Sequence, residues 1–345
     1  MNPYPWLIFL VSFLASFLSV PIVRGLALRF KILDQPGPRK MHKVATPLLG
    51  GVAVYFGLFA GSLFAFKEIS SFLPIFVGGT LILILGAIND ARELSASLRF
   101  TLQSLIAFSL VMTGFHISFL PEGYWWHTTE AFVTIMWIVG VLNAYNYLDG
   151  LDGLAVGSAV INLACFAVIL YRTSQHSLAL FSIILAVACM GFLPYNMKRT
   201  RIFLGEAGST FLGFMLAGIA VAGNWAEDGA VKLAIPILVL GVPIFDMIFT
   251  TTMRIREKKI KTVIEWMRFS GRDHFHHYLV DLGFRPLGAV VFIYFVTLAL
   301  CISAVMLGND KAPEALLALA QAFMTFGIIA ALIVAAKRRH NDFKH

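Results

Sequence analysis

Charged side chains are scarce in this sequence. Only 13% of the 345 residues are Asp, Glu, Lys or Arg, whereas 59% are hydrophobic. A chain with so little charge excludes a water-soluble or disordered protein, because it cannot cover its apolar surface with polar groups. Apolar runs long enough to cross a bilayer recur from end to end. The composition therefore predicts an all-α polytopic membrane protein.

Cysteine is also scarce. Cys165, Cys189 and Cys301 all lie inside apolar segments and show no metal-ligand spacing. The sequence thus predicts no disulfide framework and no cysteine-bound metal, and the three thiols are expected to be small buried hydrophobes.

Internal repeats, low-complexity tracts and soluble domains are missing as well. The substantial polar stretches are 24–47 and 254–286. A single integral membrane domain over residues 1–345 is the simplest interpretation. Nucleic acid is not expected as a partner, because no nucleic-acid-binding module is present. The first apolar segment has no basic region before it and no small-residue cleavage site after it, which favours a retained helix over a signal peptide.

The apolar runs divide into eleven predicted spans when segments of roughly 17 to 23 residues are counted. They are 6–23, 48–66, 72–88, 100–118, 131–148, 154–171, 178–194, 207–223, 231–253, 287–307 and 315–336. With this division, 23 of the 27 Lys and Arg residues fall in alternate connections on one side and four on the other. Because basic residues are retained in the cytoplasm, this predicts an outside N-terminus and a cytoplasmic C-terminus.

Polar residues gather where predicted spans reach the cytoplasmic side. Asn143, Asn146, Asp149 and Asp152 follow one another at intervals of three residues, with Gly150 among them. On a helix such positions drift slowly around one side, so their side chains would face a common region. Amides can donate to phosphate or sugar oxygens, and carboxylates can bind a hard cation. The alternative is a polar turn that caps a helix at the membrane surface.

Asp90 ends another predicted span on the same side, next to Asn89. A single Asp at such a place is often a solvated helix end. Its location on the side that carries the Asn/Asp cluster favours a functional role. All these groups are expected to meet in a cleft on the cytoplasmic face.

Three imidazoles follow closely in the segment 271–279, which reads GRDHFHHYL. His274, His276 and His277 lack the i, i+4 pair and the Cys partner of common zinc sites, so zinc is the less favoured interpretation. Hydrogen bonds from imidazole to a pyrophosphate fit better, and Arg272 is adjacent.

Two further elements could approach an anion. Arg39, Lys40 and His42 belong to the basic stretch DQPGPRKMHK, although basic loops occur in the cytoplasmic connections of any membrane protein. Glu206 lies in the glycine-rich turn GEAGS, where Gly would permit close approach to a ligand, although Gly and Ser also serve helix packing in membranes.

Several motifs occur together in a fixed order. They are DQPGPRKMHK followed by P..GG, the acidic end of the third span, N..N..DG.DGLA, FLGEAGSTFLG, P.FD at 243–246 and RDHFHHYLVDLGF. Over residues 34–284 the chain resembles the polyprenyl-phosphate N-acetylhexosamine-1-phosphate transferases. The resemblance implies transfer of a sugar 1-phosphate from a UDP-sugar to a membrane polyprenyl phosphate, with release of UMP and use of Mg²⁺, for which Mn²⁺ could substitute. The His segment is more similar to the branch that uses UDP-N-acetylglucosamine than to the muramoyl-pentapeptide branch.

The resemblance also implies roles for individual residues. Asp90 would lie near the lipid phosphate, and Asp149 and Asp152 would serve catalysis and the metal. The nucleotide would contact Asn143 and Asn146, and the anionic oxygens would contact the residues Arg39, Lys40, His42, His274, His276 and His277. Two positions depart from the family pattern, because Asn89 and Glu206 both stand where Asp is usual. Glu206 keeps a charge that can bind Mg²⁺, whereas Asn89 has lost one.

Alternative functions remain open. A catalytically impaired relative would bind lipid or nucleotide without releasing UMP. A transporter would place polar residues near mid-membrane and show paired repeats, whereas these polar residues cluster at one face. The expected location is the bacterial inner (plasma) membrane, where the enzyme would act in cell-envelope polysaccharide synthesis. The sequence leaves open whether the chain forms a homodimer.

Overall fold

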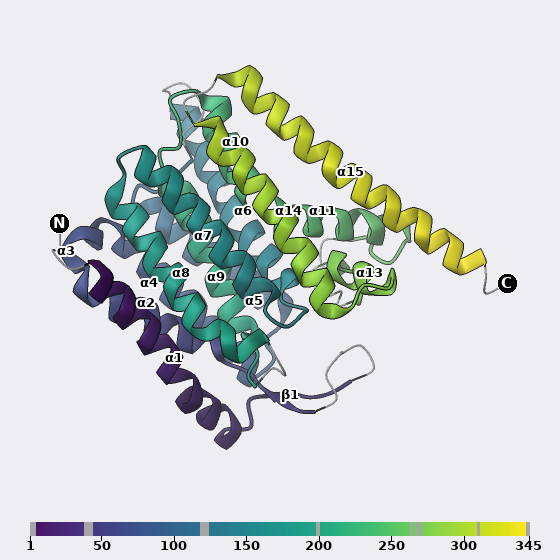
Figure 1. The fold of residues 1–345 in the computed structure, drawn as a ribbon, viewed down its shortest axis with the longest axis horizontal. Coiled ribbons are helices and arrows are strands. Elements are labelled where there is room, and N and C mark those ends of the chain that lie inside the picture. Colours follow the sequence, from purple (N-terminus) through teal and green to yellow (C-terminus); the bar gives the residue numbers. More distant parts are fainter. Residues whose placement is uncertain are drawn as a thin grey trace.

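The fold is almost entirely helical (Figure 1). The computed structural model describes residues 5–37, 44–117, 124–197, 201–262, 265–266, 269, 271–308 and 311–342. The helices are α1 (Pro5–Arg29), α2 (Gly50–Phe64), α3 (Phe66–Ile69), α4 (Leu73–Ala91), α5 (Ala96–Met112), α6 (Tyr124–Leu148), α7 (Leu154–Arg172), α8 (His176–Met197), α9 (Gly205–Ala222), α10 (Gly229–Val239), α11 (Gly241–Arg256), α13 (Phe275–Asp281), α14 (Pro286–Leu307) and α15 (Ala312–Asp342). A single 3-10 turn, η1 (Ser70–Phe72), joins α3 to α4.

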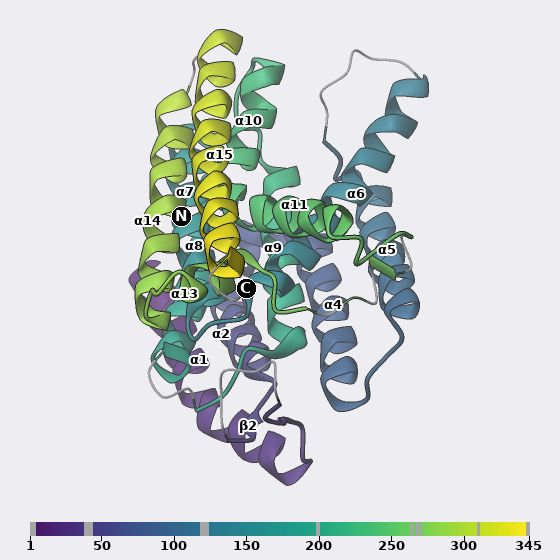
Figure 2. The ribbon, with the colours of Figure 1, turned by 90° about the vertical axis from the view of Figure 1, so that its right-hand side faces the viewer.

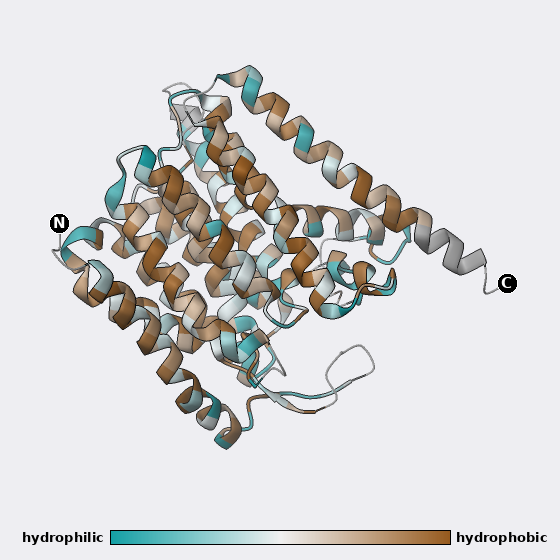
Figure 3. Cartoon of the chain, in the orientation of Figure 1, coloured by the Kyte–Doolittle hydropathy of each residue, from teal (hydrophilic) through white to brown (hydrophobic). Residues whose placement is uncertain are grey.

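Eight of these helices are long and apolar enough to cross a membrane, and a bent pair raises the number to nine. The other two predicted spans, 48–66 and 100–118, correspond to the shorter apolar helices α2 and α5. Figure 3 shows hydrophobic residues along the helices and hydrophilic ones mostly near their ends. A helix satisfies its own backbone hydrogen bonds, which is required where no water is available. The chain is therefore a multi-pass helical membrane protein.

The bent pair consists of α10 and α11, whose axes differ by 76°. The two helices meet at Leu240, and Pro243 is the third residue of α11. Proline removes a helical hydrogen bond and crowds the carbonyl four residues before it, which for Pro243 is that of Val239, and this explains a break at this point. Figure 2 shows α11 running across the direction of α10. Phe245 and Phe249 of α11 contact Phe275 and Tyr278 of α13.

Helix α9 forms the centre of the bundle. Every residue from Ala207 to Val221 is buried, and the helix packs against α4, α6 and α2. Small residues allow this close packing: a Cβ on Gly51 would lie 2.1 Å from the Cα of Gly208, and one on Gly86 would lie 2.5 Å from the Cα of Ala207. Helix α9 is thus fixed on several sides, and its first turn is held in place for the site described below.

One short antiparallel pair interrupts the helical pattern. Strand β1 (Leu33–Asp34) pairs with β2 (Thr46–Pro47), with Leu33 opposite Pro47 and Asp34 opposite Thr46. The pair lies at the edge of the bundle, beyond the end of α1 (Figure 1). It closes the predicted basic loop, whose residues Arg39, Lys40 and His42 lie outside the described residues.

Candidate active site

The end of α4 is hydrogen-bonded to the start of α9. The Asp90 carboxylate accepts from the backbone N–H of Glu206 at 2.9 Å and from that of Ala207 at 3.0 Å. The first N–H groups of a helix lack intrahelical partners and carry the positive end of the helix dipole, so a carboxylate is favourable there. Asp90 therefore fixes the first turn of α9. Its predicted role near the lipid phosphate stays a prediction.

Glycine makes this approach feasible. Gly205 has a φ of +76°, and a Cβ at this position would come within 2.5 Å of Asp90 Oδ2 and 3.2 Å of the Leu49 nitrogen. Any side chain would be strained and would displace the carboxylate. The predicted glycine turn thus serves close backbone packing at the mouth of α9.

The P..GG motif is connected to the same turn by backbone hydrogen bonds. The N–H of Phe203 donates to the carbonyl of Pro47 at 2.8 Å, and the N–H of Gly50 donates back to Phe203 at 2.9 Å. The N–H of Gly51 donates to Leu204, also at 2.9 Å. The P..GG motif and the residues that precede the glycine turn, more than 150 residues apart in the sequence, are therefore joined by backbone hydrogen bonds.

Glu206 forms polar contacts with two side chains. Its Oε2 accepts from Asn89 Nδ2 at 2.8 Å and forms an ion pair with the Arg99 guanidinium. The two departures from the family pattern are therefore in direct contact, and an amide faces the carboxylate where a second carboxylate would repel it. Arg99 was not predicted as a site residue. It counted only among the basic residues that indicate which connections lie in the cytoplasm. The sequence signal was its location nine residues after Asp90.

The two amides of the Asn/Asp cluster are already engaged by protein groups. Asn143 Nδ2 donates to Gln103 Oε1 at 3.0 Å and to the Val139 carbonyl at 2.8 Å. Asn146 Oδ1 accepts from Ser209 Oγ at 2.7 Å, which joins α6 to α9. These bonds orient α6, and the predicted contacts of both amides with substrate stay predictions.

The two carboxylates of the cluster lie beyond the helix. Helix α6 ends at Leu148 and α7 begins at Leu154, so Asp149 and Asp152 occupy the turn between them. Gly153, with a φ of +79°, makes this turn, and its N–H and carbonyl are fixed by Asn196 and Tyr294. The helical spacing that motivated the prediction therefore holds only for the two amides.

Unbalanced negative charge surrounds Asp149. Burial, followed by the charges of Asp90, Asp152 and Asp34, raises its pKa to about 7. Within the described part of the chain, no hydrogen bond to the carboxylate of Asp149 or Asp152 is found. A bound cation would remove this penalty, so these two carboxylates have the donor chemistry that Mg²⁺ requires. Glu206 could contribute its second oxygen, because Oε2 is the atom held by Asn89 and Arg99.

His276 borders this turn. A Cβ on Gly150 would lie 2.0 Å from His276 Nε2, so the imidazole packs directly on the glycine between Asp149 and Leu151. The side chain is 1% exposed, yet neither ring nitrogen has a hydrogen-bond partner among the described residues. Buried polar atoms without partners are rare, which indicates a place for a ligand. Burial and the neighbouring His277 and His274 lower the pKa of His276 well below its usual value, so the ring is neutral.

His277 lies next to it, with ring centroids 4.2 Å apart. Burial and then the charge of Arg272 lower the pKa of His277 to about 4. Both rings are thus neutral at physiological pH, and each can offer one N–H to an anionic oxygen.

A buried ionic network joins α11 to the His segment. Arg254 is 1% exposed and binds Asp273 through two parallel bonds of 2.9 and 2.8 Å. Although burial opposes it, this contact lowers the pKa of the Asp273 carboxyl. Asp246 accepts from the N–H of Phe275 at 2.6 Å, and its other oxygen lies 3.1 Å from His274 Nδ1. Asp246 and Arg254 were not predicted as site residues, although Asp246 belongs to the P.FD motif.

The network also fixes the tautomer of His274. Its Nε2 lies 3.4 Å from Arg254 Nη2, and arginine can only donate. The proton must then be on Nδ1, which faces Asp246. His274 is therefore committed to the protein, whereas His276 and His277 remain available to a ligand.

An apolar groove of about 670 Å³ lies between α1 and α2. Its lining includes Leu18, Ile22, Leu26, Leu49, Phe56 and Phe59. Leu49 is the lining residue nearest the site, because a Cβ on Gly205 would lie 3.2 Å from its backbone nitrogen and 2.5 Å from Asp90 Oδ2. The groove therefore has one lining residue in common with the surroundings of the glycine turn.

Comparisons with known proteins agree with this arrangement. A family model described as glycosyl transferase family 4 matches residues 72–224. A probable undecaprenyl-phosphate N-acetylglucosaminyl 1-phosphate transferase of Bacillus subtilis is 34% identical over 306 residues, which cover 87% of this chain and 84% of the relative. The decaprenyl-phosphate N-acetylglucosaminephosphotransferase of Mycolicibacterium smegmatis is 30% identical over 323 residues, covering 84% of this chain and 78% of the relative.

The undecaprenyl-phosphate alpha-N-acetylglucosaminyl 1-phosphate transferase of Yersinia pestis is 27% identical over 298 residues, covering 83% of this chain and 79% of the relative. The resemblance read from the motifs is confirmed by these matches. The similarity extends across most of the helices that build the site, and the chain belongs to glycosyl transferase family 4.

Proposed function

We propose that this protein transfers N-acetylglucosamine 1-phosphate from its UDP-sugar to a polyprenyl phosphate and releases UMP. The relatives named above carry out the corresponding transfer to undecaprenyl or decaprenyl phosphate, according to their names. The observation that carries the proposal is the convergence of Asp90, Asp149 and His276, with an apolar groove whose lining residue Leu49 lies beside Gly205. The reaction would be the first membrane step of cell-envelope polysaccharide synthesis in the bacterial inner membrane.

We infer that all eleven apolar segments cross the membrane, with α2 and α5 included. The N-terminus would be outside and the C-terminus in the cytoplasm, as the separation of 23 basic residues from four indicates. The site would then face the cytoplasm, where a UDP-sugar is available.

In the proposed reaction an oxygen of the polyprenyl phosphate attacks the phosphorus that carries the sugar. A new P–O–P bond forms, the bridging bond to the uridine-bearing phosphate breaks, and UMP leaves with that oxygen. The acceptor oxygen is already largely ionised near neutral pH, so no strong base is required. The task of the protein is to align two anions and to neutralise their charge.

The residues can be given distinct tasks in this scheme. Asp149 and Asp152 would hold Mg²⁺, or Mn²⁺ in its place, and the ion would neutralise the pyrophosphate as its bridging bond breaks. Asp90 would keep the first turn of α9 in position, with Glu206 beside it. His276 and His277 would donate to pyrophosphate oxygens. Arg39, Lys40 and His42 remain proposed phosphate contacts.

The acceptor's polyprenyl chain would lie in the apolar groove between α1 and α2, so that its phosphate reaches Leu49 and the glycine turn. Filling the groove tests this, because Ala60 lines it. Ala60→Phe should raise the KM for polyprenyl phosphate about tenfold and leave the KM for the UDP-sugar unchanged. An unchanged acceptor KM would place the chain elsewhere.

Release of UMP by purified protein in lipid nanodiscs tests the activity itself. UMP should appear only when UDP-N-acetylglucosamine, polyprenyl phosphate and Mg²⁺ are all present. Asp149→Asn should abolish it. Asp228→Asn is the control for the chemical change, because Asp228 caps the start of α10 and is not among the site residues, and Asn caps equally well. Release from Asp149→Asn at the wild-type rate would refute the assignment.

The second candidate is a catalytically impaired relative that binds lipid or nucleotide. The contact of Glu206 with Asn89 and Arg99 favours it, since the carboxylate that would assist the metal is occupied. Nucleotide binding without UMP release, together with activity gained in an Asn89→Asp, Glu206→Asp double variant, would support this candidate.

A further inference from the structure

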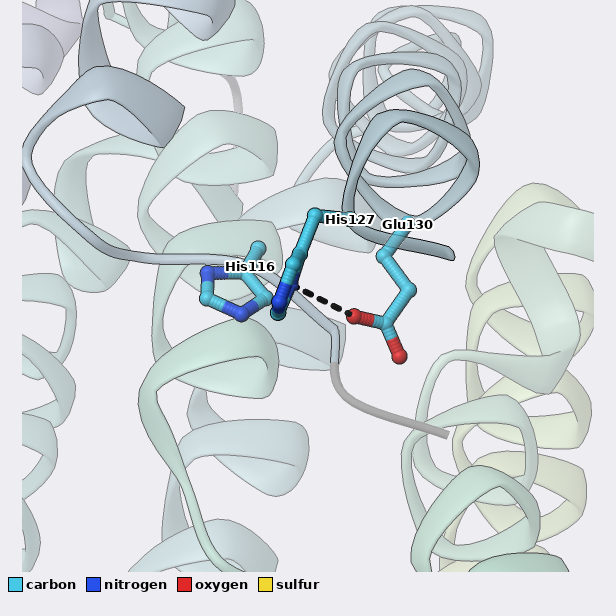
Figure 4. Close-up of side chains that lie close together, drawn as sticks. All are labelled: His116, His127 and Glu130. Atoms are coloured by element: carbon cyan, nitrogen blue, oxygen red, sulfur yellow. Dashed lines mark ion pairs between the residues drawn. The ribbon is translucent and has the colours of Figure 1, made fainter. Parts of the chain in front are cut away.

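A second group of metal-binding side chains lies far from the proposed active site. His116 follows the end of α5, and His127 and Glu130 lie one turn apart near the start of α6. Their ligand atoms all lie within 4.8 Å of one another. Figure 4 shows the two imidazoles side by side and the Glu130 carboxylate turned toward His127.

The group is at the opposite end of α6 from Asp149. About 21 residues separate His127 from the end of the helix, which corresponds to roughly 30 Å at 1.5 Å per residue. The group therefore cannot take part in the proposed transfer reaction. With the sidedness inferred above, it would face the outside of the membrane.

The protein holds these side chains in place before any ion binds. The N–H of Ile117 donates to Thr134 Oγ1 at 2.9 Å, and this hydroxyl donates to the Glu130 carbonyl at 2.6 Å. Thr134 is completely buried, so the segment that carries His116 is fixed against α6. The positions of the ligands thus depend on the packed helix and not on a free loop.

Burial of the carboxylate is the second indication. Glu130 is 3% exposed near the start of α6, whereas acidic side chains are rarely so completely buried. His127 Nδ1 lies 4.0 Å from Glu130 Oε2. That separation exceeds a hydrogen bond and leaves room between the atoms.

We propose that His116, His127 and Glu130 bind a divalent transition-metal ion of the zinc class. Two imidazoles and a carboxylate are ligands that Zn²⁺ accepts, and water would complete a tetrahedral site. Ligand atoms about 2.0 to 2.1 Å from Zn²⁺ lie roughly 3.3 Å apart, so the group closes by about 1.5 Å or less on binding. The ion would tie the segment after α5 to the start of α6.

The test is Zn²⁺ binding by the untagged full-length protein in nanodiscs, after treatment with a chelator and with Mg²⁺ held constant. Isothermal titration should show a Zn²⁺ site that weakens at least tenfold in His116→Ala and in His127→Ala. His176→Ala is the matched control, because His176 is another exposed imidazole, located at the start of α8 and beside Tyr171, outside the group. Zn²⁺ should raise the unfolding midpoint of the wild type and of this control, but not of the two cluster variants.

Two outcomes would overturn the proposal. Zinc that binds equally to His116→Ala and His127→Ala would belong to the imidazoles of the other site, and a His276→Ala variant would then lose it. Absence of any Zn²⁺ binding would show that His127 and Glu130 form an ion pair only. Co²⁺ in place of Zn²⁺ provides an independent measurement, since its absorption spectrum distinguishes a tetrahedral site.

Discussion

Two pairs of carboxylates meet in the candidate active site, and their surroundings differ. Asp90 and Glu206 are paired with backbone N–H groups, an amide and a guanidinium. Asp149 and Asp152 have no such partner among the described residues and face other carboxylates. The first pair is therefore part of the architecture, whereas the second lacks protein partners, and a bound cation would favour its ionised form.

This difference indicates that Asp90 and Glu206 hold the site together, whereas Asp149 and Asp152 take part in the reaction. Removal of a paired carboxylate should cost both stability and activity, because its partners lose their contacts. Removal of an unpaired one should cost activity alone. The following predictions test that division, beginning with the largest effect.

Asp152→Asn should lower kcat by about a thousandfold, since a metal ligand contributes several kcal/mol to stabilisation of the transition state. The thermal unfolding midpoint should stay at the wild-type value, because Asp152 is exposed in a turn. UMP release and a melting curve, measured on the same sample, provide both quantities. A large drop in the midpoint would show that Asp152 belongs to the architecture instead.

Asp90→Ala should lower both stability and activity. Two N–H groups at the start of α9 would lose their acceptor, which costs about 1 to 2 kcal/mol and displaces the glycine turn. Activity should fall about a hundredfold. Asp90→Asn, which keeps one acceptor, should recover part of the stability. If activity falls while the midpoint stays unchanged, Asp90 acts directly on substrate.

His276→Ala tests whether an anion binds beside the unpaired carboxylates. Loss of one hydrogen bond to a charged oxygen should raise the KM for the UDP-sugar about tenfold, with a smaller change in kcat. His274→Ala is the comparison, because His274 is held by Asp246 and Arg254 and its loss should lower stability. Equal KM effects in both variants would argue against a special role for His276.

Asp149→Asn should make the protein more stable while it abolishes activity. The pKa of Asp149 is raised from 3.8 to about 7, so its ionised form is disfavoured in the folded state. Below pH 3.8 Asp149 is protonated in the folded and in the unfolded protein, and the raised pKa costs no stability. As the pH rises toward 7, the unfolded protein loses this proton first, and the free energy of unfolding therefore falls. With chelator present, the variant's advantage should therefore grow between pH 5 and 7 and then level off, reaching roughly 2 °C or more. Mg²⁺ should reduce it, and an advantage independent of pH would contradict the charge argument.

Much of the fold was predictable because a membrane-spanning helix is a run of consecutive apolar residues, which can be read directly from the sequence. Each predicted segment overlaps an observed helix, although the predicted span 231–253 is divided by a bend into α10 and α11. The predicted span 131–148 ends where α6 ends, whereas the three-residue spacing carried helical geometry on to Asp152. Spacing alone could not show the turn at Asp149 to Gly153, because this turn depends on contacts from Asn196 and Tyr294.

Most residues of the site could be predicted from the sequence, but the role of each residue could be predicted only in part. Order and residue type marked Asp90, Asp149 and His276, since polar groups are rare in this chain. Arg99 and Arg254 were hidden among basic residues that topology already explained. Their partners, Glu206 and Asp273, are 107 and 19 residues away, and no local pattern reveals such pairs.

The sequence by itself determined that the protein lies in a membrane, where its helices are and which residue types its site contains, because these depend on composition and local order. Only the tertiary structure decided which carboxylates are bound by protein groups and which are left without a partner among the described residues. That distinction depends on distances of a few ångströms between α4, α6 and α9, and packing of distant segments sets those distances. The same packing brought His116, His127 and Glu130 together at the other end of α6.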